Sequence, residues 1–368
     1  MFPKGVKTME KKYRVLAINP GSTSTKVGIY EGSEMLYEGT VRHSREELAE
    51  FTTIYAQKDM RLKLVESLIE ENGFKASEMD AFVGRGGIIR PLKSGVYNIG
   101  EKLMDDLINL PSAQRHASML GGVIARAFGD QYGKPSFIVD PVTVDERDEI
   151  AKITGLPQIK RDCIFHCLNQ KSVCRYHCRL NGLKYEDLNL VVAHMGGGIS
   201  VAAHRKGVIV DVTDAISGEG PFTPERCGYI PAKQLADLIY SGKYSSDEVY
   251  KLISGKGGLM AHFNTNSALD VEKAAESGDE HAKMIYDAMG YNIAKACGQM
   301  ATVLCGKVDA VILTGGLAYS KMLTDYITER VSFIAPVAVY PGEGELSALA
   351  AGAIRVLSGE EQAKEYLG

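Results

Sequence analysis

The chain has 368 residues, of which 45% are hydrophobic and 24% charged, and its formal net charge is -4. This length predicts two domains, because a single hydrophobic core rarely grows beyond ~250–300 residues. The slightly acidic balance argues against a nucleic-acid partner or an anionic membrane surface, since both need a basic field. No run of about 18 apolar residues is present, so we expect no transmembrane span.

The amino-terminal residues and the cysteines bear on the compartment. Residues 1–12 are polar and basic without an apolar stretch, so we expect no signal peptide and consider Met9 as an alternative start. The seven cysteines are an odd number in a chain without secretory features, which is typical of free thiols in a reducing environment. We therefore expect a cytoplasmic protein.

The first predicted element in chain order is a β-hairpin. An apolar run at 14–18 leads into Asn19-Pro20-Gly21-Ser22-Thr23-Ser24-Thr25-Lys26, and a second β-rich segment follows at 27–30. Helical patterns come next at 59–72, 116–129 and 163–181, with a short strand at 136–139 that ends in Asp140.

A second hairpin of the same design begins at residue 190. Its first strand ends in His194-Met195-Gly196-Gly197-Gly198-Ile199-Ser200, and its second covers 201–203. Both second strands end in a short glycine-containing turn. The repeat, half a chain apart, suggests a duplicated domain, although so short a match also arises by chance.

The remainder of the chain alternates between helical and strand patterns. A loop rich in Gly and Pro at 217–231 precedes helical stretches at 231–254 and 274–305. Strands follow at 310–313 and 337–340, and a small-residue helix at 345–357. This alternation predicts an α/β protein with two sheets. No long linker separates the halves, so we expect them to face each other across a cleft.

Three loops of glycine and hydroxyl residues stand at predicted strand ends, namely Gly21-Ser22-Thr23-Ser24, Gly196-Gly197-Gly198 and Thr314-Gly315-Gly316. Glycine lets backbone N–H groups approach phosphate oxygens, and Ser or Thr adds further donors. Each loop alone is weak support for phosphate binding, but three in one chain are stronger. The absence of a Walker A motif and of a Gly-x-Gly-x-x-Gly fingerprint argues against a P-loop enzyme or a Rossmann dehydrogenase.

Taken together, the motifs resemble those of the acetate kinase family. They are Asn19 to Lys26, Arg85-Gly86-Gly87, Phe165-His166, His194 to Gly198, Arg226-Cys227-Gly228, Thr314-Gly315-Gly316-Leu317 and Pro341-Gly342-Glu343-Gly344-Glu345. Residues 18–26 and 193–207 are most similar to the members of the family that use butyrate. The match keeps motif order over nearly the whole chain.

The resemblance implies the actin/sugar-kinase/Hsp70 ATPase fold, with two duplicated ribonuclease-H-like domains facing each other across a nucleotide cleft. The first domain would cover 1–165, with a carboxyl-terminal helix at about 345–368 returning to it. The second, nucleotide-binding domain would cover 166–344. The family also implies a homodimer or a larger homo-oligomer, formed through the second domain.

The implied reaction is ATP-dependent phosphorylation of a short-chain fatty acid, in which butanoate and ATP give butanoyl phosphate and ADP reversibly. Transfer would be direct and in line, with Mg²⁺ as cofactor. The acceptor carboxylate has a pKa of ~4 and is already ionised at neutral pH, so no general base is needed. Alternative acids are branched-chain acids, propionate and acetate. A remote alternative is a non-catalytic ATP-binding regulator, which would not need Arg85, His194 and Arg226.

The resemblance also assigns roles to individual residues. Arg85 and Arg226 would clamp phosphate and carboxylate, while His166 and His194 would donate hydrogen bonds to the phosphoryl group. Asp140 would take part in catalysis and, with Glu345, hold Mg²⁺ largely through water. The substrate-binding set is His116, Gly87 and Phe165. The nucleotide-binding set is Asn19, Ser22, Ser24, Lys26, Gly196, Gly197, Gly198, Gly315, Gly316 and Leu317.

The sequence departs from the family pattern at three places. Gly87 replaces a bulky apolar residue, and the run Ile216-Ser217-Gly218-Glu219-Gly220 replaces a Thr-Pro-Leu-Glu-Gly run. Smaller side chains there would widen the acyl pocket, so we expect C4 or C5 acids to be better substrates than acetate, in a graded way. Leu269 stands where relatives place an arginine near the adenine, which puts nucleotide affinity in doubt.

Other interpretations apply to several of these side chains. Outside the motifs, Arg85 and Arg226 would pass for surface arginines and His166 for a hydrogen-bonded core residue. The cysteines at 163, 167, 174 and 178 have spacings that place them on one face of a helix. Cys163 and Cys178 would then be over ~20 Å apart, too far for one metal ion. We therefore expect a stripe of small buried side chains, and a metal protein only remotely.

Overall fold

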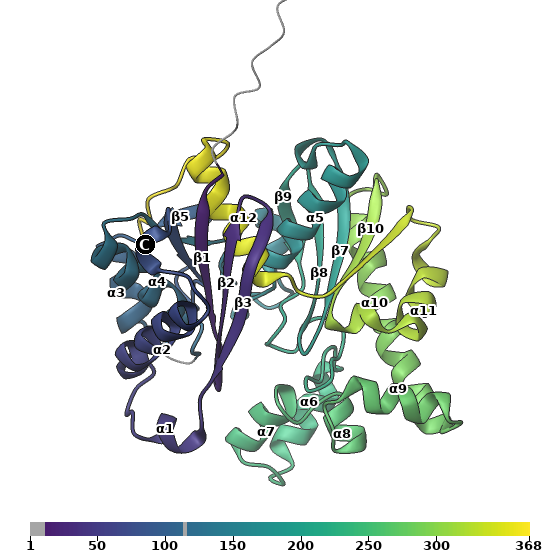
Figure 1. The fold of residues 1–368 in the computed structure, drawn as a ribbon. Coiled ribbons are helices and arrows are strands. Elements are labelled where there is room, and N and C mark those ends of the chain that lie inside the picture. Colours follow the sequence, from purple (N-terminus) through teal and green to yellow (C-terminus); the bar gives the residue numbers. More distant parts are fainter. Residues whose placement is uncertain (1–11, 113–115) are drawn as a thin grey trace, which may run out of the picture. The chain divides into compact units, whose positions relative to one another are not determined.

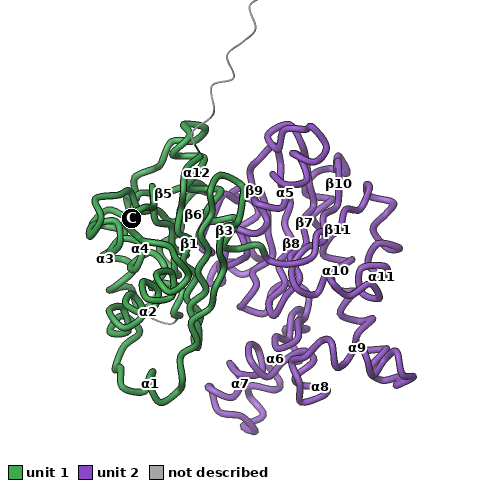
Figure 2. Tube along the Cα trace, in the orientation of Figure 1, with its two compact units in different colours: residues 1–141, 344–368 green, residues 142–343 purple. Residues whose placement is uncertain are grey.

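The computed structural model describes residues 12–112 and 116–368. They divide into two compact units, shown in Figure 2: the described residues up to 141 together with 344–368, and residues 142–343. The carboxyl-terminal helix belongs to the first unit, and residues 142–165, which we expected in the first domain, belong to the second. There the Phe165 amide donates to Val142 O at 3.1 Å and the Asp148 amide to Val210 O at 2.9 Å. The proposed start at Met9 lies outside the described residues.

The first unit contains a six-stranded sheet with the order β3-β2-β1-β4-β6-β5. Its strands are β1 (Arg14–Pro20), β2 (Ser24–Glu31), β3 (Glu34–Arg42), β4 (Ala81–Gly84), β5 (Val96–Asn98) and β6 (Ser136–Val139). The hairpin strands β1 to β3 pair antiparallel, β1, β4 and β6 run parallel, and β5 pairs antiparallel with β6.

Helices pack on the sheet of the first unit because consecutive residues of its central strands are apolar, so both faces of the sheet must be buried. The helices are α1 (Arg45–Ala49), α2 (Lys58–Glu71), α3 (Glu101–Asn109), α4 (Met119–Tyr132) and α12 (Glu345–Ser358). Leu16 and Ile18 of β1 pack with Val65 of α2 and Val123 of α4 in one core cluster. Helix α12, from the far end of the chain, packs against β1, β2 and β4 (Figure 1).

The second unit contains a five-stranded sheet with the order β11-β10-β7-β8-β9. Its strands are β7 (Asn189–Met195), β8 (Ile199–Arg205), β9 (Val208–Val212), β10 (Ala310–Gly315) and β11 (Val337–Pro341). Its helices are α5 (Cys167–Asn181), α6 (Ala232–Tyr240), α7 (Ser246–Ile253), α8 (Leu259–Phe263), α9 (Ala268–Glu276), α10 (Glu280–Val303) and α11 (Lys321–Val331). Val191 and Ala193 of β7 pack in the cluster that holds α10, whereas Leu190 and Val192 pack with α5.

The two sheets repeat one plan. In each, an antiparallel three-stranded meander (β1-β2-β3 and β7-β8-β9) is followed by parallel strands on the other side of its first strand. The second strand of each meander carries a register irregularity, at Ile29/Tyr30 in β2 and at Ala203/His204 in β8. The predicted α/β class with two sheets is confirmed, and the repeated topology supports the duplication.

Several predicted helices differ from those observed. The pattern at 231–254 forms two helices, α6 and α7, and the pattern at 274–305 is interrupted between α9 and α10. The interruption coincides with Gly278, whose φ of +99° ends one helix, and with Asp279, which caps the next by accepting from Ala282 N. In the described part of the chain, no helix combines the length and apolarity that crossing a membrane requires.

Candidate functional site

In the first unit, three predicted site residues lie at the ends of neighbouring parallel strands. The register pairs Ile18 of β1 with Gly84 of β4, and Gly84 with Ile138 of β6. Asn19, Arg85 and Asp140 come one or two residues later. Because the carboxyl ends of parallel strands meet at one edge of a sheet, these three residues lie along the same edge.

Glu345 joins this edge from the other end of the chain. It begins α12, and its carboxylate accepts from Asn19 Nδ2 at 2.5 Å and forms an ion pair with Arg85. A carboxylate in the first turn of a helix is also favoured by the helix dipole. The structure therefore brings together Asn19, Arg85 and Glu345.

A buried arginine donates hydrogen bonds to the backbone of the loop between β1 and β2. Arg61 of α2 is fully buried and donates to the carbonyl oxygens of Gly21, Ser22 and Ser24 at 2.9, 3.2 and 3.1 Å. With its carbonyls turned to Arg61, the loop leaves Ser22 and Lys26 exposed. Burial lowers the pKa of Arg61 to about 10, which still leaves the guanidinium charged at neutral pH.

Asp140 follows β6 with an unusual backbone conformation. Its φ is +39°, a region that costs a non-glycine residue roughly 1–3 kcal/mol and is often found at functional sites. The buried carboxylate accepts from Gly95 N at 2.7 Å. The surrounding backbone thus holds Asp140 in place.

His116 and Gly87 were predicted to contact the acid substrate. His116 Nδ1 lies 2.9 Å from Ser118 Oγ, and burial followed by the charge of Arg85 lowers the pKa of His116. A Cβ at Gly87 would lie 2.9 Å from both Cα and Cβ of Met119. The space of the missing side chain is therefore taken by Met119, which does not support the interpretation that Gly87 widens a pocket. Arg115, which precedes His116 in its motif, lies outside the described residues.

In the second unit, His166 and His194 stack face to face. Their ring centroids are 3.8 Å apart and their planes differ by 12°. His194, on β7, contacts Asn169 Oδ1 through Nδ1 at 2.7 Å, and His166, just before α5, contacts Ser200 Oγ through Nδ1 at 2.9 Å. We call these two residues the histidine pair. Phe165, beside them in the chain, is buried.

The glycine loop after β7 adjoins Arg226. A Cβ at Gly198 would lie 2.0 Å from a terminal guanidinium nitrogen of Arg226 and 3.2 Å from His166 Cε1. Thr223 Oγ1 donates to Gly197 O at 2.8 Å, and Arg226 donates to Ala215 O at 3.0 Å. Arg226 Nε is buried and has no hydrogen-bond partner within the described residues. A half-buried guanidinium beside a glycine loop has the donors that bind phosphate or carboxylate.

The loop after β10 lies next to the same strand end. Thr314 of β10 pairs with His194 of β7 in the parallel ladder. Gly315 has a φ of +91°, and a Cβ there would lie 2.3 Å from Met195 O, so only glycine fits. Gly316 and Leu317 begin a short 3₁₀ helix that follows. Leu269, on α9, is 57% exposed.

The cysteine prediction requires one correction. Cys163 lies before α5, where its thiol contacts Val144 O at 3.3 Å, because the helix starts only at Cys167. Cys167, Cys174 and Cys178 are buried on α5, as expected of a packed stripe. Among the described residues, no three His, Cys, Asp or Glu side chains gather as a metal site would require.

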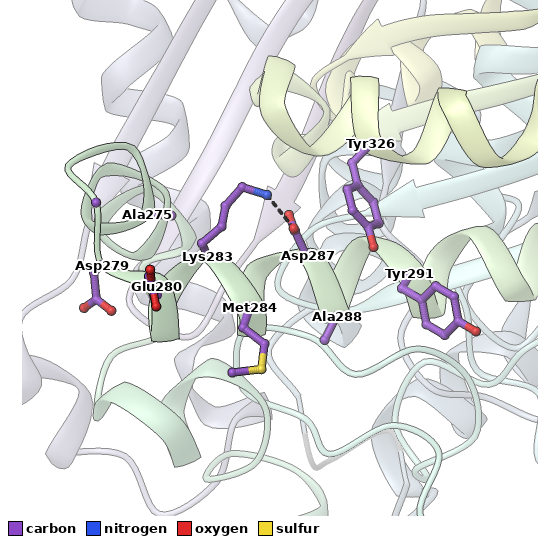
Figure 3. Close-up of a pocket in the computed structure, with 10 residues that line it drawn as sticks. Ala275, Asp279, Glu280, Lys283, Met284, Asp287, Ala288, Tyr291 and Tyr326 are labelled. Carbon is purple, nitrogen blue, oxygen red and sulfur yellow. Dashed lines mark hydrogen bonds and ion pairs between the residues drawn. The ribbon is translucent and has the colours of Figure 1, made fainter.

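A pocket of about 550 Å³ in the second unit contains none of the predicted residues. It is lined by the end of α9, the first half of α10 and Tyr326 of α11 (Figure 3). Lys283 and Asp287, one turn apart on α10, form an ion pair in its lining. We assign this pocket no role.

Comparisons with known proteins show the family of this chain. A model of the acetokinase family matches residues 158–334. The chain is 49% identical over 355 residues to butyrate kinase 2 of Clostridium acetobutylicum, covering 96% of this chain and 99% of that protein. The chain belongs to the acetokinase family. It is therefore a phosphotransferase with a carboxyl group as acceptor and with ATP or ADP as nucleotide substrate.

Other relatives agree with this assignment. A probable butyrate kinase of Clostridium botulinum is 48% identical over 354 residues, with 96% of this chain and 99% of that protein covered. The crystal structure of Porphyromonas gingivalis acetate kinase matches with a TM-score of 0.77 at 19% identity, covering 94% of this chain and 100% of that one. Acetate kinase of Entamoeba histolytica matches with a TM-score of 0.74 at 17% identity, covering 93% and 99%. The structural matches confirm the predicted two-domain fold.

Sequence reasoning missed the residues that support these side chains. Arg61 lies in a predicted helical pattern that gave no reason to expect a buried charge. Asn169, Gln170 and Ser200 contact the histidine pair or each other, and only the chain proximity of Asn169 and Gln170 to His166 hinted at this. Their roles depend on contacts between distant segments.

Proposed function

We propose that this protein phosphorylates butanoate with ATP, forming butanoyl phosphate and ADP in a reversible reaction. The observation that carries this proposal is the 49% identity to butyrate kinase 2 of C. acetobutylicum over 96% of the chain. The positions of the predicted motif residues at strand ends support it.

In this proposal the protein's main task is to bring two anions together. The carboxylate of butanoate attacks the γ-phosphorus directly, and the bond to the bridging oxygen of ADP breaks in line. Arg85 and Arg226 offer charged donors for the carboxylate and the transferring phosphoryl group. The histidine pair donates hydrogen bonds to the equatorial oxygens, where charge must be balanced.

Loop and edge residues would bind the nucleotide. The backbone and side chains of Asn19, Ser22, Ser24 and Lys26 would bind the phosphates, as would the backbone of Gly196, Gly197 and Gly198. Gly315, Gly316 and Leu317 would lie beside the adenosine. This assignment is supported by the exposure of Ser22 and Lys26 and by the close approach that Gly315 permits.

Mg²⁺ belongs to the proposal as the partner of the nucleotide phosphates, where it would neutralise their charge. The ion prefers oxygen ligands and keeps several waters, so one or two carboxylates suffice. Asp140 and Glu345 provide that chemistry, and the engagement of Glu345 with Asn19 and Arg85 suits contact through water. The carboxylates present therefore fit the ion.

Further parts of the proposal concern assembly, compartment and acid range. We propose a homodimer or larger homo-oligomer, and a cytoplasmic location, which the seven free cysteines support. Butanoate is the proposed acid, with branched C4–C5 acids, propionate and acetate as weaker alternatives. A hydrophobic pocket distinguishes one methylene by only ~1–3 kcal/mol, so the preference should be graded.

The test is acyl-phosphate formation with Mg-ATP, trapped with hydroxylamine, over straight and branched acids from C2 to C6. We expect a maximum at C4 or C5. Arg226→Ala should lose at least ~10³-fold in kcat/KM, because a charged clamp on the transferring group disappears. Arg205→Ala is the matched control, since Arg205 belongs to the same unit and pairs with Asp148 at 2.8 Å. Full activity of Arg226→Ala, or equal efficiency on acetate and butanoate, would contradict the proposal.

A further inference from the structure

The hydrogen bonds of the histidine pair determine which ring nitrogen of each residue carries its proton. The role of these tautomers in phosphoryl transfer rests on the proposed function, whereas the tautomers themselves follow from the hydrogen bonds alone. His166 and His194 each use Nδ1 to contact a side chain whose own orientation is fixed by a backbone carbonyl. A carbonyl oxygen only accepts hydrogen bonds, so it decides the direction of every bond connected to it.

For His194 the deciding group is the backbone carbonyl of Glu343. Asn169 Nδ2 donates to Glu343 O at 2.5 Å, which turns Asn169 Oδ1 toward His194. Oδ1 accepts only, so the contact of 2.7 Å requires a proton on His194 Nδ1. With Nδ1 protonated, His194 Nε2 carries a proton only when the ring is the cationic imidazolium.

For His166 the deciding group is the backbone carbonyl of Ser200. Gln170 Nε2 donates to Ser200 O at 3.1 Å and to Ser200 Oγ at 3.0 Å. The His166 amide also points its N–H toward Ser200 Oγ, at 3.5 Å. Three nitrogens contact Ser200 Oγ, and two of them, Gln170 Nε2 and the His166 amide, are donors. Only the third, His166 Nδ1 at 2.9 Å, can accept the proton of the Ser200 hydroxyl. His166 therefore carries its proton on Nε2.

The hydrogen bonds that connect Gln170 to the buried His204, and His204 to the buried Tyr185, are consistent with this assignment of donors and acceptors. Gln170 Oε1 lies 3.1 Å from His204 Nε2, which must donate to it. His204 is fully buried, and burial holds its pKa well below the usual value, so the ring is neutral and Nδ1 is an acceptor. Tyr185 OH, 2.6 Å from that Nδ1, donates a hydrogen bond to it and stays protonated because burial raises its pKa, while the Cys174 thiol lies farther away at 3.6 Å. The donors run in one direction from Tyr185 to His166.

We propose that Asn169 and Gln170, consecutive residues on α5, hold the histidine pair in opposite tautomers. His166 presents a neutral Nε2–H donor, while His194 keeps its proton on Nδ1 and donates from Nε2 only as a cation. Asn169, Gln170 and Ser200 are positioning residues in this scheme. Two parallel rings 3.8 Å apart would repel if both were charged, so the arrangement assigns any single positive charge to His194.

The experiment reads the tautomers directly, without turnover. Two-bond ¹H–¹⁵N correlation spectra of the full-length protein with ¹⁵N-labelled histidine rings distinguish Nδ1–H, Nε2–H and the cation. His166→Asn and His194→Asn spectra assign the signals. We expect Nε2–H for His166, and either Nδ1–H or the cation for His194. A neutral Nε2–H form of His194, or Nδ1–H for His166, would overturn the proposal.

Variants then test the positioning residues one at a time. Ser200→Ala should release the tautomer of His166 and leave His194 unchanged, and Asn169→Ala should do the reverse. Each should lower kcat about tenfold, the lower end of the loss seen when orienting partners of histidine ligands are removed. KM should change little, since ground-state binding is preserved. Thr324→Val, which removes a buried hydroxyl on α11, is the control and should alter neither signal.

The outcomes separate this inference from the proposed function. If the protein shows the expected tautomers but forms no acyl phosphate, the tautomer inference is supported and the proposed function is contradicted. Acyl-phosphate formation with the tautomers reversed would do the opposite. If a variant fails to fold, the wild-type spectrum still decides, because it requires no substitution in the network.

Discussion

Gly198→Ala is the most direct test of how the glycine loop after β7 and Arg226 fit together. A Cβ at this position would lie 2.0 Å from a guanidinium nitrogen of Arg226, whereas ordinary contact begins at 3.4 Å. The guanidinium must therefore move by about 1.4 Å, the difference of these distances. A misplacement of ~1 Å in a catalytic group costs roughly 10²-fold in rate. That loss corresponds to about 2.7 kcal/mol of transition-state stabilisation, at ~1.36 kcal/mol for each factor of ten.

Folding stability should change much less than activity. Gly198 has no left-handed backbone angle, and the atom it would strike is the flexible end of a side chain. We expect at most the loss of the hydrogen bond from Arg226 to Ala215 O, about 0.5–1.5 kcal/mol.

The assay compares kcat/KM for acyl-phosphate formation with the midpoint of urea unfolding followed by circular dichroism. Gly197→Ala is the matched neighbour, because no described atom lies within 4 Å of a Cβ built there. Gly197→Ala should retain more activity than Gly198→Ala, and its urea midpoint should equal that of the wild type. Wild-type kcat/KM in Gly198→Ala would refute the reasoning, as would equal losses in both variants.

Three further variants test other parts of the structure. Arg61→Met removes the hydrogen-bond donor of three loop carbonyls, which costs ~1–3 kcal/mol of folding stability for each carbonyl. Because the variant no longer buries a guanidinium, part of this cost is offset, and urea unfolding should show a net decrease of about 3 kcal/mol in the free energy of unfolding. An unchanged urea midpoint would contradict this expectation. Because burial lowers the pKa of His204, its titration leaves the free energy of unfolding unchanged above the unfolded pKa of ~6.5. Below that value only the unfolded state takes up the proton, so the free energy of unfolding decreases as pH falls. His204→Gln should therefore lose less stability than wild type between pH 7.5 and 5.5, and parallel losses would argue against it. Gly87→Ala overpacks against Met119 and should cost ~1–3 kcal/mol without changing the ratio of acetate to butanoate turnover, whereas a shift toward acetate at full stability would restore the pocket interpretation.

The sequence alone was sufficient for the local features of this protein. Both hairpins were predicted, because strand propensity and small-residue loops are properties of neighbouring residues. The family motifs proposed Arg85, His166, His194 and Arg226 as candidate site residues from their residue types and their order in the chain. Helix interruptions were harder: the break at Gly278 needs a left-handed backbone angle that a helical pattern does not reveal.

Tertiary structure decided which of these residues meet and what supports them. Glu345 contacts Asn19 and Arg85 because α12 returns to the first sheet, bridging more than half the chain. Met119 fills the space beside Gly87, and Arg61 reaches the β1–β2 loop from α2. The sequence by itself determined the candidate chemistry, since residue types and short spacings are local. The orientation of each donor and acceptor depended on the fold, because a hydrogen bond is directed by its partner and the partners here lie on distant segments.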